Sequence, residues 1–195
     1  MPQVAQDQGK VTLALVALGA NLSIGGQTPE MTLRKALAML LNETVQIRAV
    51  SRFFRSPAYP AGSGPDYVNA VAALEVRIDA EYLLKHLHAV EVQLGRTRTS
   101  RWESRVVDLD LLCHGESVLP DAATQAAWRM LPAEEQTRAA PGQLILPHPR
   151  IADRAFVLLP LAEVAPGWVH PATGKGVAAM LAALPAADKA ALRPL

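Results

Sequence analysis

Two carboxylates, Asp108 and Asp110, occupy alternate positions in an apolar segment. In a strand, successive side chains point to opposite faces, so the two acids share one face while Val107, Leu109 and Leu111 share the other. The α-carbons of the acids then lie about 6–7 Å apart, which lets both carboxylates bind one divalent ion or a pair of ions. Carboxylate oxygens suit hard cations such as Mg²⁺, and Mg²⁺ in turn favours polyphosphate.

The segment before the acids is rich in positive charge. It contains four arginines and one indole, namely Arg96, Arg98, Arg101, Arg105 and Trp102. A guanidinium donates paired hydrogen bonds to phosphate oxygens, so this composition complements a metal-bound polyphosphate. Taken alone, an Asp-x-Asp pair is common and an arginine-rich loop is usually a solvated surface. The combination of the two indicates a site for metal and polyphosphate.

The composition of the chain is that of a modest globular protein. With 195 residues, half of them hydrophobic, it can bury a sizeable core, and we expect a single domain over residues 1–195. The net charge of +1 gives no reason to expect nucleic acid or a membrane as a partner. The one cysteine, Cys113, follows an apolar strand and is predicted to be a buried thiol.

The sequence also bears on location. No apolar run approaches the length needed to cross a bilayer, and the polar start from Met1 to Lys10 lacks the regions of a secretion signal. We therefore expect a cytoplasmic protein, and we predict a monomer.

The elements that must position the acids follow from the spacing of apolar residues. Apolar runs and two-residue alternation predict strands, while helical spacing after the capping residues Thr28 and Asp79 predicts helices. In chain order these are a strand at 11–18 with a turn at 19–21, a helix at 29–41, strands at 44–53 and 67–78, a helix at 80–94 and a strand at 105–113. This βαββαβ order predicts an α+β, ferredoxin-like fold, with a mostly antiparallel sheet and both helices packed on one face.

The rest of the chain continues beyond these elements, in segments of different composition. Residues 116–143 are rich in Ala and Pro, and their portion 123–130 could form a short helix. Further helices are predicted near 155–165 and 176–184. Gly174-Lys175-Gly176 lacks the pattern of a phosphate-binding P-loop, and the histidines lack zinc-type spacing.

Six groups of residues occur in the order found in one enzyme family. They are Gly19-Ala20-Asn21-Leu22, Phe54-Arg55-Ser56-Pro57, Pro65 to Ala70, Glu91 with Gly95 to Arg98, Trp102 to Asp110, and Leu146-Pro147-His148 with Arg154 to Leu161. Over a core of about 11–166, interrupted by the insertion at about 116–143, the chain resembles 6-hydroxymethyl-7,8-dihydropterin pyrophosphokinase. The resemblance implies transfer of pyrophosphate from ATP to the hydroxymethyl group of the pterin, releasing AMP, in folate biosynthesis.

The resemblance also implies roles for individual residues. Asp108 and Asp110 would bind two Mg²⁺ ions and, with Arg96 and Arg105, form the catalytic group. The residues implied for ATP are Glu91, Arg98, Trp102, Leu111, His148 and Arg154. The residues implied for the pterin are Ser56, Pro57, Tyr59, Tyr67, Asn69, Trp102 and Phe156. Without the resemblance, Tyr67 and Phe156 would be interpreted as core aromatics and His148 as a structural residue.

Two other functions use the same residue types. A nucleotidyltransferase could employ the acids and arginines, but it would release pyrophosphate instead of AMP. A non-catalytic binding domain would bind nucleotide or pterin without turnover, and the acidic pair argues against it.

Overall fold

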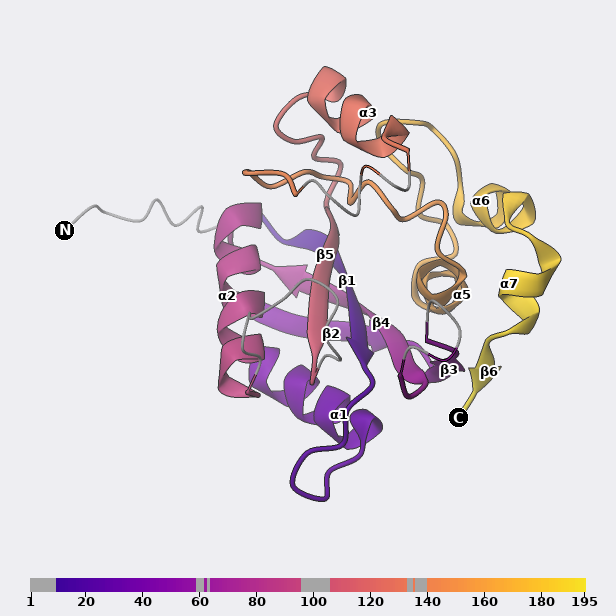
Figure 1. The fold of residues 1–195 in the computed structure, drawn as a ribbon. Coiled ribbons are helices and arrows are strands. Elements are labelled where there is room, and N and C mark those ends of the chain that lie inside the picture. The colour runs from indigo at the N-terminus through magenta and orange to yellow at the C-terminus, as the bar shows by residue number, and fades with distance from the viewer. Residues whose placement is uncertain (1–9, 59–61, 63, 96–105, 133–134, 136–139) are drawn as a thin grey trace.

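A computed structural model describes residues 10–58, 62, 64–95, 106–132, 135 and 140–195. Within these residues the strands form one open sheet, and helices cover both of its faces (Figure 1). The elements are β1 (Thr12–Ala20), α1 (Pro29–Leu40), β2 (Val45–Val50), β3 (Phe54–Ser56), β4 (Tyr67–Val76), α2 (Ala80–Gln93), β5 (Asp108–His114), α3 (Ala122–Met130), α5 (Ala155–Val164), α6 (Val177–Ala183), α7 (Ala186–Ala190) and β6 (Arg193–Pro194). None of the described helices is long and apolar enough to span a membrane.

The sheet has the strand order β5-β1-β4-β3-β6, and β2 pairs with β4 beyond the end of β3. Every pairing among these strands is antiparallel. The helices α1 and α2 follow β1 and β4 in the chain and pack together on one face. This arrangement confirms the predicted α+β, ferredoxin-like fold.

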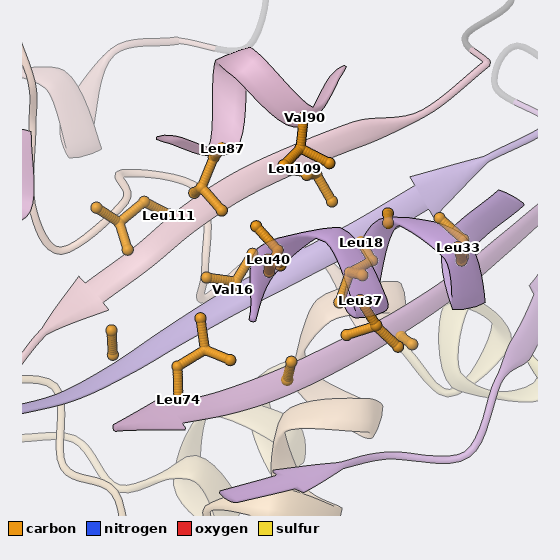
Figure 2. Packing of buried hydrophobic residues seen from close by; sticks show 14 of the residues in the cluster. Val16, Leu18, Leu33, Leu37, Leu40, Leu74, Leu87, Val90, Leu109 and Leu111 are labelled. Atoms are coloured by element: carbon orange, nitrogen blue, oxygen red, sulfur yellow. The ribbon is translucent and has the colours of Figure 1, made fainter. Parts of the chain in front are cut away.

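The first core lies between the sheet and the helices α1 and α2. Both helices begin at the predicted caps, since the side chains of Thr28 and Asp79 accept hydrogen bonds from the backbone N–H groups of Met31 and Tyr82. Figure 2 shows the facing leucines and valines, which are Leu33, Leu37, Leu40, Leu87 and Val90 from the helices and Val16, Leu18, Leu74, Leu109 and Leu111 from the strands. The apolar residues at helical spacing and the apolar residues that alternate along the strands therefore pack against one another on this face, as predicted.

The second core covers the opposite face of the sheet and is built by the C-terminal part of the chain. Leu15, Val71 and Leu112 of the sheet pack there with residues of α5 and α6, including Leu158 and Met180. Cys113 belongs to this core, and burial raises the pKa of its thiol to about 12, which confirms the predicted buried thiol. We refer to this side of the sheet as the α5 face.

Two strand boundaries were predicted wrongly. Gly19 and Ala20 do not form the expected turn, because they remain in β1 and pair with Asn69 and Val68 of β4. The predicted strand at 44–53 ends early, as β2 at Val50, and a separate short strand that was not predicted, β3, follows at Phe54–Ser56. At the break, the Ser51 hydroxyl accepts a hydrogen bond from the N–H of Val71 at 3.0 Å, so a side chain replaces the backbone acceptor of the ladder.

Other differences lie at the ends of elements. The predicted strand at 105–113 begins at Asp108 in the structure, and the short helix expected at 123–130 is present as α3. The elements α7 and β6 were not predicted. The two-residue strand β6 pairs with β3 through Phe54 and Arg55, and such a short segment has no periodicity for a sequence pattern to detect.

The chain between β2 and β3 is fastened to α5 by Glu163. This carboxylate accepts hydrogen bonds from the Arg52 backbone N–H at 2.9 Å and from the Arg52 guanidinium at 2.8 and 2.6 Å. Partial burial opposes ionisation, but the hydrogen bonds from Arg52 outweigh it and hold the pKa of Glu163 below its usual value.

We predict that Glu163→Gln destabilises the fold in a pH-dependent way. A carboxylate with a lowered pKa in the folded state contributes stability above its unfolded pKa, and that contribution is lost as the pH falls through the folded pKa. The difference in unfolding free energy between the wild type and the variant should therefore be small but measurable at neutral pH, and should shrink below the ordinary pKa of 4.5. Urea unfolding across this range measures it, with exposed Glu43→Gln as control. A difference that does not vary with pH would contradict the prediction.

Candidate active site

The two acids lie on the α5 face of β5, the edge strand next to β1. Asp108 is opposite Gly19 of β1, and Asp110 is opposite Ala17. On the other side of β5, Leu109 is buried in the core under α1 and α2, as the alternation predicted. The side chain of Asp110 is 37 % exposed. The acids therefore stand at an accessible surface, and their neighbours on β1 are small.

A polar pair lies across the sheet from the acids. Asn69 of β4 is opposite Gly19, so Asp108, Gly19 and Asn69 form one row across three adjacent strands. The amide nitrogen of Asn69 donates a hydrogen bond of 2.9 Å to the buried hydroxyl of Ser56 on β3. Tyr67, two residues before Asn69 on the same face of β4, is opposite Ser56. The sheet thus brings together three residues that were predicted to bind the pterin.

The N-terminus of α5 brings two further predicted residues to this face. A guanidinium nitrogen of Arg154 lies 3.7 Å from a carboxylate oxygen of Asp110. The guanidinium carbon of Arg154 is also 5.7 Å from the centre of the Phe156 ring. Phe156 is 37 % exposed and lies outside both buried clusters, which argues against a role as a core aromatic.

His148 lies beside the acids on the segment that precedes α5. Its backbone N–H donates to the carbonyl of Leu112 at 2.8 Å, where the β1–β5 register shifts and leaves Leu112 without a partner on β1. Burial and the positive charge of Arg154 lower the pKa of His148 to about 3, although the negative charge of Asp108 opposes the shift. Its Nδ1 accepts the N–H of Arg150 at 3.1 Å, so the neutral ring carries its proton on Nε2. That N–H can donate to an anionic ligand.

Two residues predicted to bind ATP are buried. Glu91 of α2 is 1 % exposed, and its carboxylate accepts a hydrogen bond of 2.8 Å from the backbone N–H of Leu109, the residue between the two acids. Leu111 points into the core under α1 and α2, so any nucleotide contact at this position would have to use its backbone. The structure therefore gives Glu91 a clear function in fixing the strand that carries the acids.

Several predicted residues lie outside the described part of the chain. These are Tyr59, Arg96, Arg98, Trp102 and Arg105. Pro57 is described, and it is exposed directly after Ser56 at the end of β3.

Gly19 was not among the predicted site residues, because the sequence pattern assigned this glycine to a turn. A glycine inside a strand often marks a place where a ligand approaches the backbone closely, and that signal was available. A β-carbon at Gly19 would lie 3.6 Å from the side-chain oxygen of Asn69, in the space between Asn69 and Asp108.

The donor set of the acids fits Mg²⁺. Among the described residues, no three His, Cys, Asp or Glu side chains gather into a metal site. A site of two carboxylates is nevertheless appropriate, because Mg²⁺ is commonly bound by one or two carboxylates, with water and substrate phosphates completing the coordination. Asp108 and Asp110 could therefore hold Mg²⁺ together with a polyphosphate.

We predict that filling the space above Gly19 blocks the site. Gly19→Val should raise the KM of a ligand lying between Asp108 and Asn69 by about tenfold or more, because a branched side chain would occupy that space while suiting the strand backbone. Gly19→Ala should have a smaller effect, since 3.6 Å is an ordinary contact distance. Steady-state kinetics and thermal unfolding measure the two effects separately. Unchanged KM values in a folded Gly19→Val protein would contradict the prediction.

Comparison with known proteins shows the family of the chain. The family model for 7,8-dihydro-6-hydroxymethylpterin-pyrophosphokinase (HPPK) matches residues 15–166. A 2-amino-4-hydroxy-6-hydroxymethyldihydropteridine pyrophosphokinase from Synechocystis is 36 % identical over 166 residues, covering 84 % of this chain and 72 % of the relative. The enzyme of the same name from Pseudomonas aeruginosa is 36 % identical over 172 residues, covering 87 % of this chain and 90 % of the relative.

Solved structures show the same fold. The wild-type HPPK-DHPS of Plasmodium falciparum, crystallised with pteroate, superposes with a TM-score of 0.64 at 11 % identity. The match covers 89 % of this chain but only 44 % of that one, so the present chain spans less than half of the length of HPPK-DHPS.

Fold and site together define a class. The open antiparallel sheet makes this an α+β protein, and two carboxylates beside an arginine are the side chains that bind a divalent cation and phosphate oxygens. Within that class, the chain belongs to the 7,8-dihydro-6-hydroxymethylpterin-pyrophosphokinase family. The family resemblance derived from the sequence is thereby confirmed.

Proposed function

We propose that this chain transfers pyrophosphate from ATP to the hydroxymethyl group of 6-hydroxymethyl-7,8-dihydropterin, giving the pterin diphosphate and AMP in folate biosynthesis. The observation that carries the proposal is the row Asp108–Gly19–Asn69, which places the acidic pair and the Asn69–Ser56 pair on one face of the sheet. In the reaction, the hydroxyl oxygen of the pterin bonds to the β-phosphorus of ATP and loses its proton. The bond between that phosphorus and the α–β bridging oxygen breaks, and AMP leaves.

The side of the site that carries the acids would bind the phosphates. Asp108 and Asp110 would hold two Mg²⁺ ions, and these ions would neutralise the charge that develops on the phosphate oxygens. Arg154, 3.7 Å from Asp110, and the Nε2–H of His148 can donate hydrogen bonds to those oxygens. Both donors lie on one stretch of chain, just before and at the start of α5.

The side of the site formed by β3 and β4 would bind the pterin. The amide nitrogen of Asn69 is engaged by Ser56, and this contact orients the amide oxygen toward the space above Gly19 as an acceptor for an N–H on the edge of the heterocycle. Tyr67 and Phe156 would stack on the faces of the ring, with Trp102. Pro57 and Tyr59 would complete the pocket near the ring edge.

The remaining predictions of the sequence are kept as proposals. Arg96 and Arg105 would stabilise the transferred group, and Arg98, Glu91 and Leu111 would contribute to the ATP site. We also propose a monomeric, single-domain, cytoplasmic enzyme whose partners are small molecules, with neither nucleic acid nor membrane among them.

A product assay tests the function. The protein is incubated with ATP, Mg²⁺ and the hydroxymethyl dihydropterin, and AMP, ADP and pyrophosphate are resolved. We expect AMP and pterin diphosphate in equal amounts, with turnover dependent on both substrates. Pyrophosphate with a nucleotidyl adduct would identify a nucleotidyltransferase instead, and binding without any product would identify a non-catalytic domain.

A further inference from the structure

Among the described residues of the insertion, one polar side chain is completely buried. Gln125, in the middle of α3, is 0 % exposed and is the buried residue of that helix. Its amide nitrogen donates to the carbonyl of Pro147 at 3.1 Å, and the guanidinium of Arg129 donates to its amide oxygen at 3.5 Å. A carbonyl can only accept and a guanidinium can only donate, so these two partners fix the orientation of the amide.

The partner carbonyl belongs to the residue directly before His148. The insertion holds the same segment at a second point, where Leu119 and Leu146 exchange both backbone hydrogen bonds, at 2.8 and 3.1 Å. On its other side the segment is attached to β5 by the hydrogen bond from His148 to Leu112. The chain around His148 is therefore held between the strand that carries the acids and the insertion.

We propose that Gln125 is a positioning residue for the phosphate side of the site and that the insertion serves as its support. Gln125 acts through the Pro147 carbonyl, which fixes the backbone of His148 relative to Asp108 and Arg154. This inference rests on the proposed function, because it assigns the effect of Gln125 to nucleotide binding. It gives a role to a segment that the pyrophosphokinase motifs do not include.

A buried backbone carbonyl that loses its hydrogen-bond donor destabilises the segment that carries it. Without the donor of Gln125, the Pro147 carbonyl would face a non-donating side chain in a buried place, and the segment would shift to regain a partner. A displacement of about 1 Å is enough to disturb a positioned catalytic or binding group. The hydrogen bonds described for Gln125 go to Pro147 and Arg129 and not to the pterin residues on β3 and β4, so pterin binding should be unaffected.

The test uses two variants of Gln125 in the full chain. Gln125→Leu removes the donor, and Gln125→Glu keeps the shape but places an acceptor against the Pro147 carbonyl. We expect the KM for ATP, and the Kd for a nonhydrolysable ATP analogue with Mg²⁺, to rise by about tenfold for Leu and by more for Glu. The Kd for the pterin alone should change less than about twofold.

A matched control comes from the other end of the sheet. Gln46 of β2 also donates its amide to a backbone carbonyl, that of Asn42, at 2.6 Å. Gln46→Leu should leave both affinities at wild-type values. In case the Gln125 variants do not fold, Arg129→Met removes only the group that orients the amide, and it should shift nucleotide affinity in the same direction by a smaller factor.

Amide hydrogen exchange gives a readout that does not depend on turnover. The N–H groups of Leu146 and His148 should exchange faster in Gln125→Leu, while that of Val71 on β4 should not. Folded variants that bind nucleotide like the wild type, or that lose nucleotide and pterin affinity equally, would overturn the positioning role. A wild type that binds nucleotide but forms no AMP would overturn the proposed reaction instead, and the exchange and binding measurements would still decide the role of Gln125.

Discussion

Asp108→Asn and Asp110→Asn should each lower kcat for AMP formation by about a thousandfold or more, because each removes an anionic ligand where the reaction needs a divalent cation. The fold should survive. Both side chains lie on the polar face of β5, away from the core under α1 and α2, so neither substitution opens a cavity. AMP formation and thermal unfolding should be measured on the same samples.

The control for the acids is Asp188→Asn, on the exposed helix α7. It should be fully active. Binding of the pterin should be affected less than turnover in the Asp108 and Asp110 variants, since Asn69 and Ser56 remain in place. A double variant that retains near-normal AMP formation would eliminate the assignment of these acids as metal ligands.

Tyr67→Ala and Phe156→Ala should each weaken binding of the pterin by roughly 1–3 kcal/mol, through loss of an aromatic partner and of buried area. Phe156 is 37 % exposed, so its removal should cost little stability. Calorimetric titration with the pterin, and separately with a nonhydrolysable ATP analogue and Mg²⁺, measures the two affinities.

Tyr82→Ala, on α2, serves as the aromatic control because Tyr82 is 49 % exposed and lies on the opposite side of the sheet from α5. Its affinities should equal those of the wild type. If Tyr67→Ala or Phe156→Ala lost nucleotide and pterin affinity equally, the aromatic residue would be a support of the fold and not part of a pterin slot.

Local patterns were sufficient to predict most of the fold. Leu33, Leu37 and Leu40 repeat at helical spacing, and Leu109 and Leu111 alternate with the acids, so each segment carries the period of its own element. The predictions were wrong where a residue distant in the sequence determines the local backbone conformation. Gly19 stays extended because β4 and β5 pair with it on both sides, and β2 ends because the Ser51 hydroxyl meets the N–H of Val71.

The same division holds for the site. Asp108 and Asp110 were identifiable because their spacing within one strand places them together without reference to any other segment. The contacts that join Asn69 to Ser56 and Arg154 to Asp110 depend on register and on the placement of α5, which no local pattern encodes. The role of Gln125 could not be predicted either. A glutamine in an Ala-rich helix gives no sign that its partner is a backbone carbonyl 22 residues away.

The pairing of β6 with β3 affects how the protein behaves toward other copies of itself. An uncovered edge strand offers free N–H and C=O groups to any extended chain that meets it, which is a common start of aggregation. Arg193 and Pro194 cover that edge along Phe54 and Arg55, and the N–H of Leu195 bonds to the carbonyl of Phe53 at 2.9 Å. The strand that carries Ser56 is thereby withdrawn from intermolecular β-sheet addition along Phe54 and Arg55.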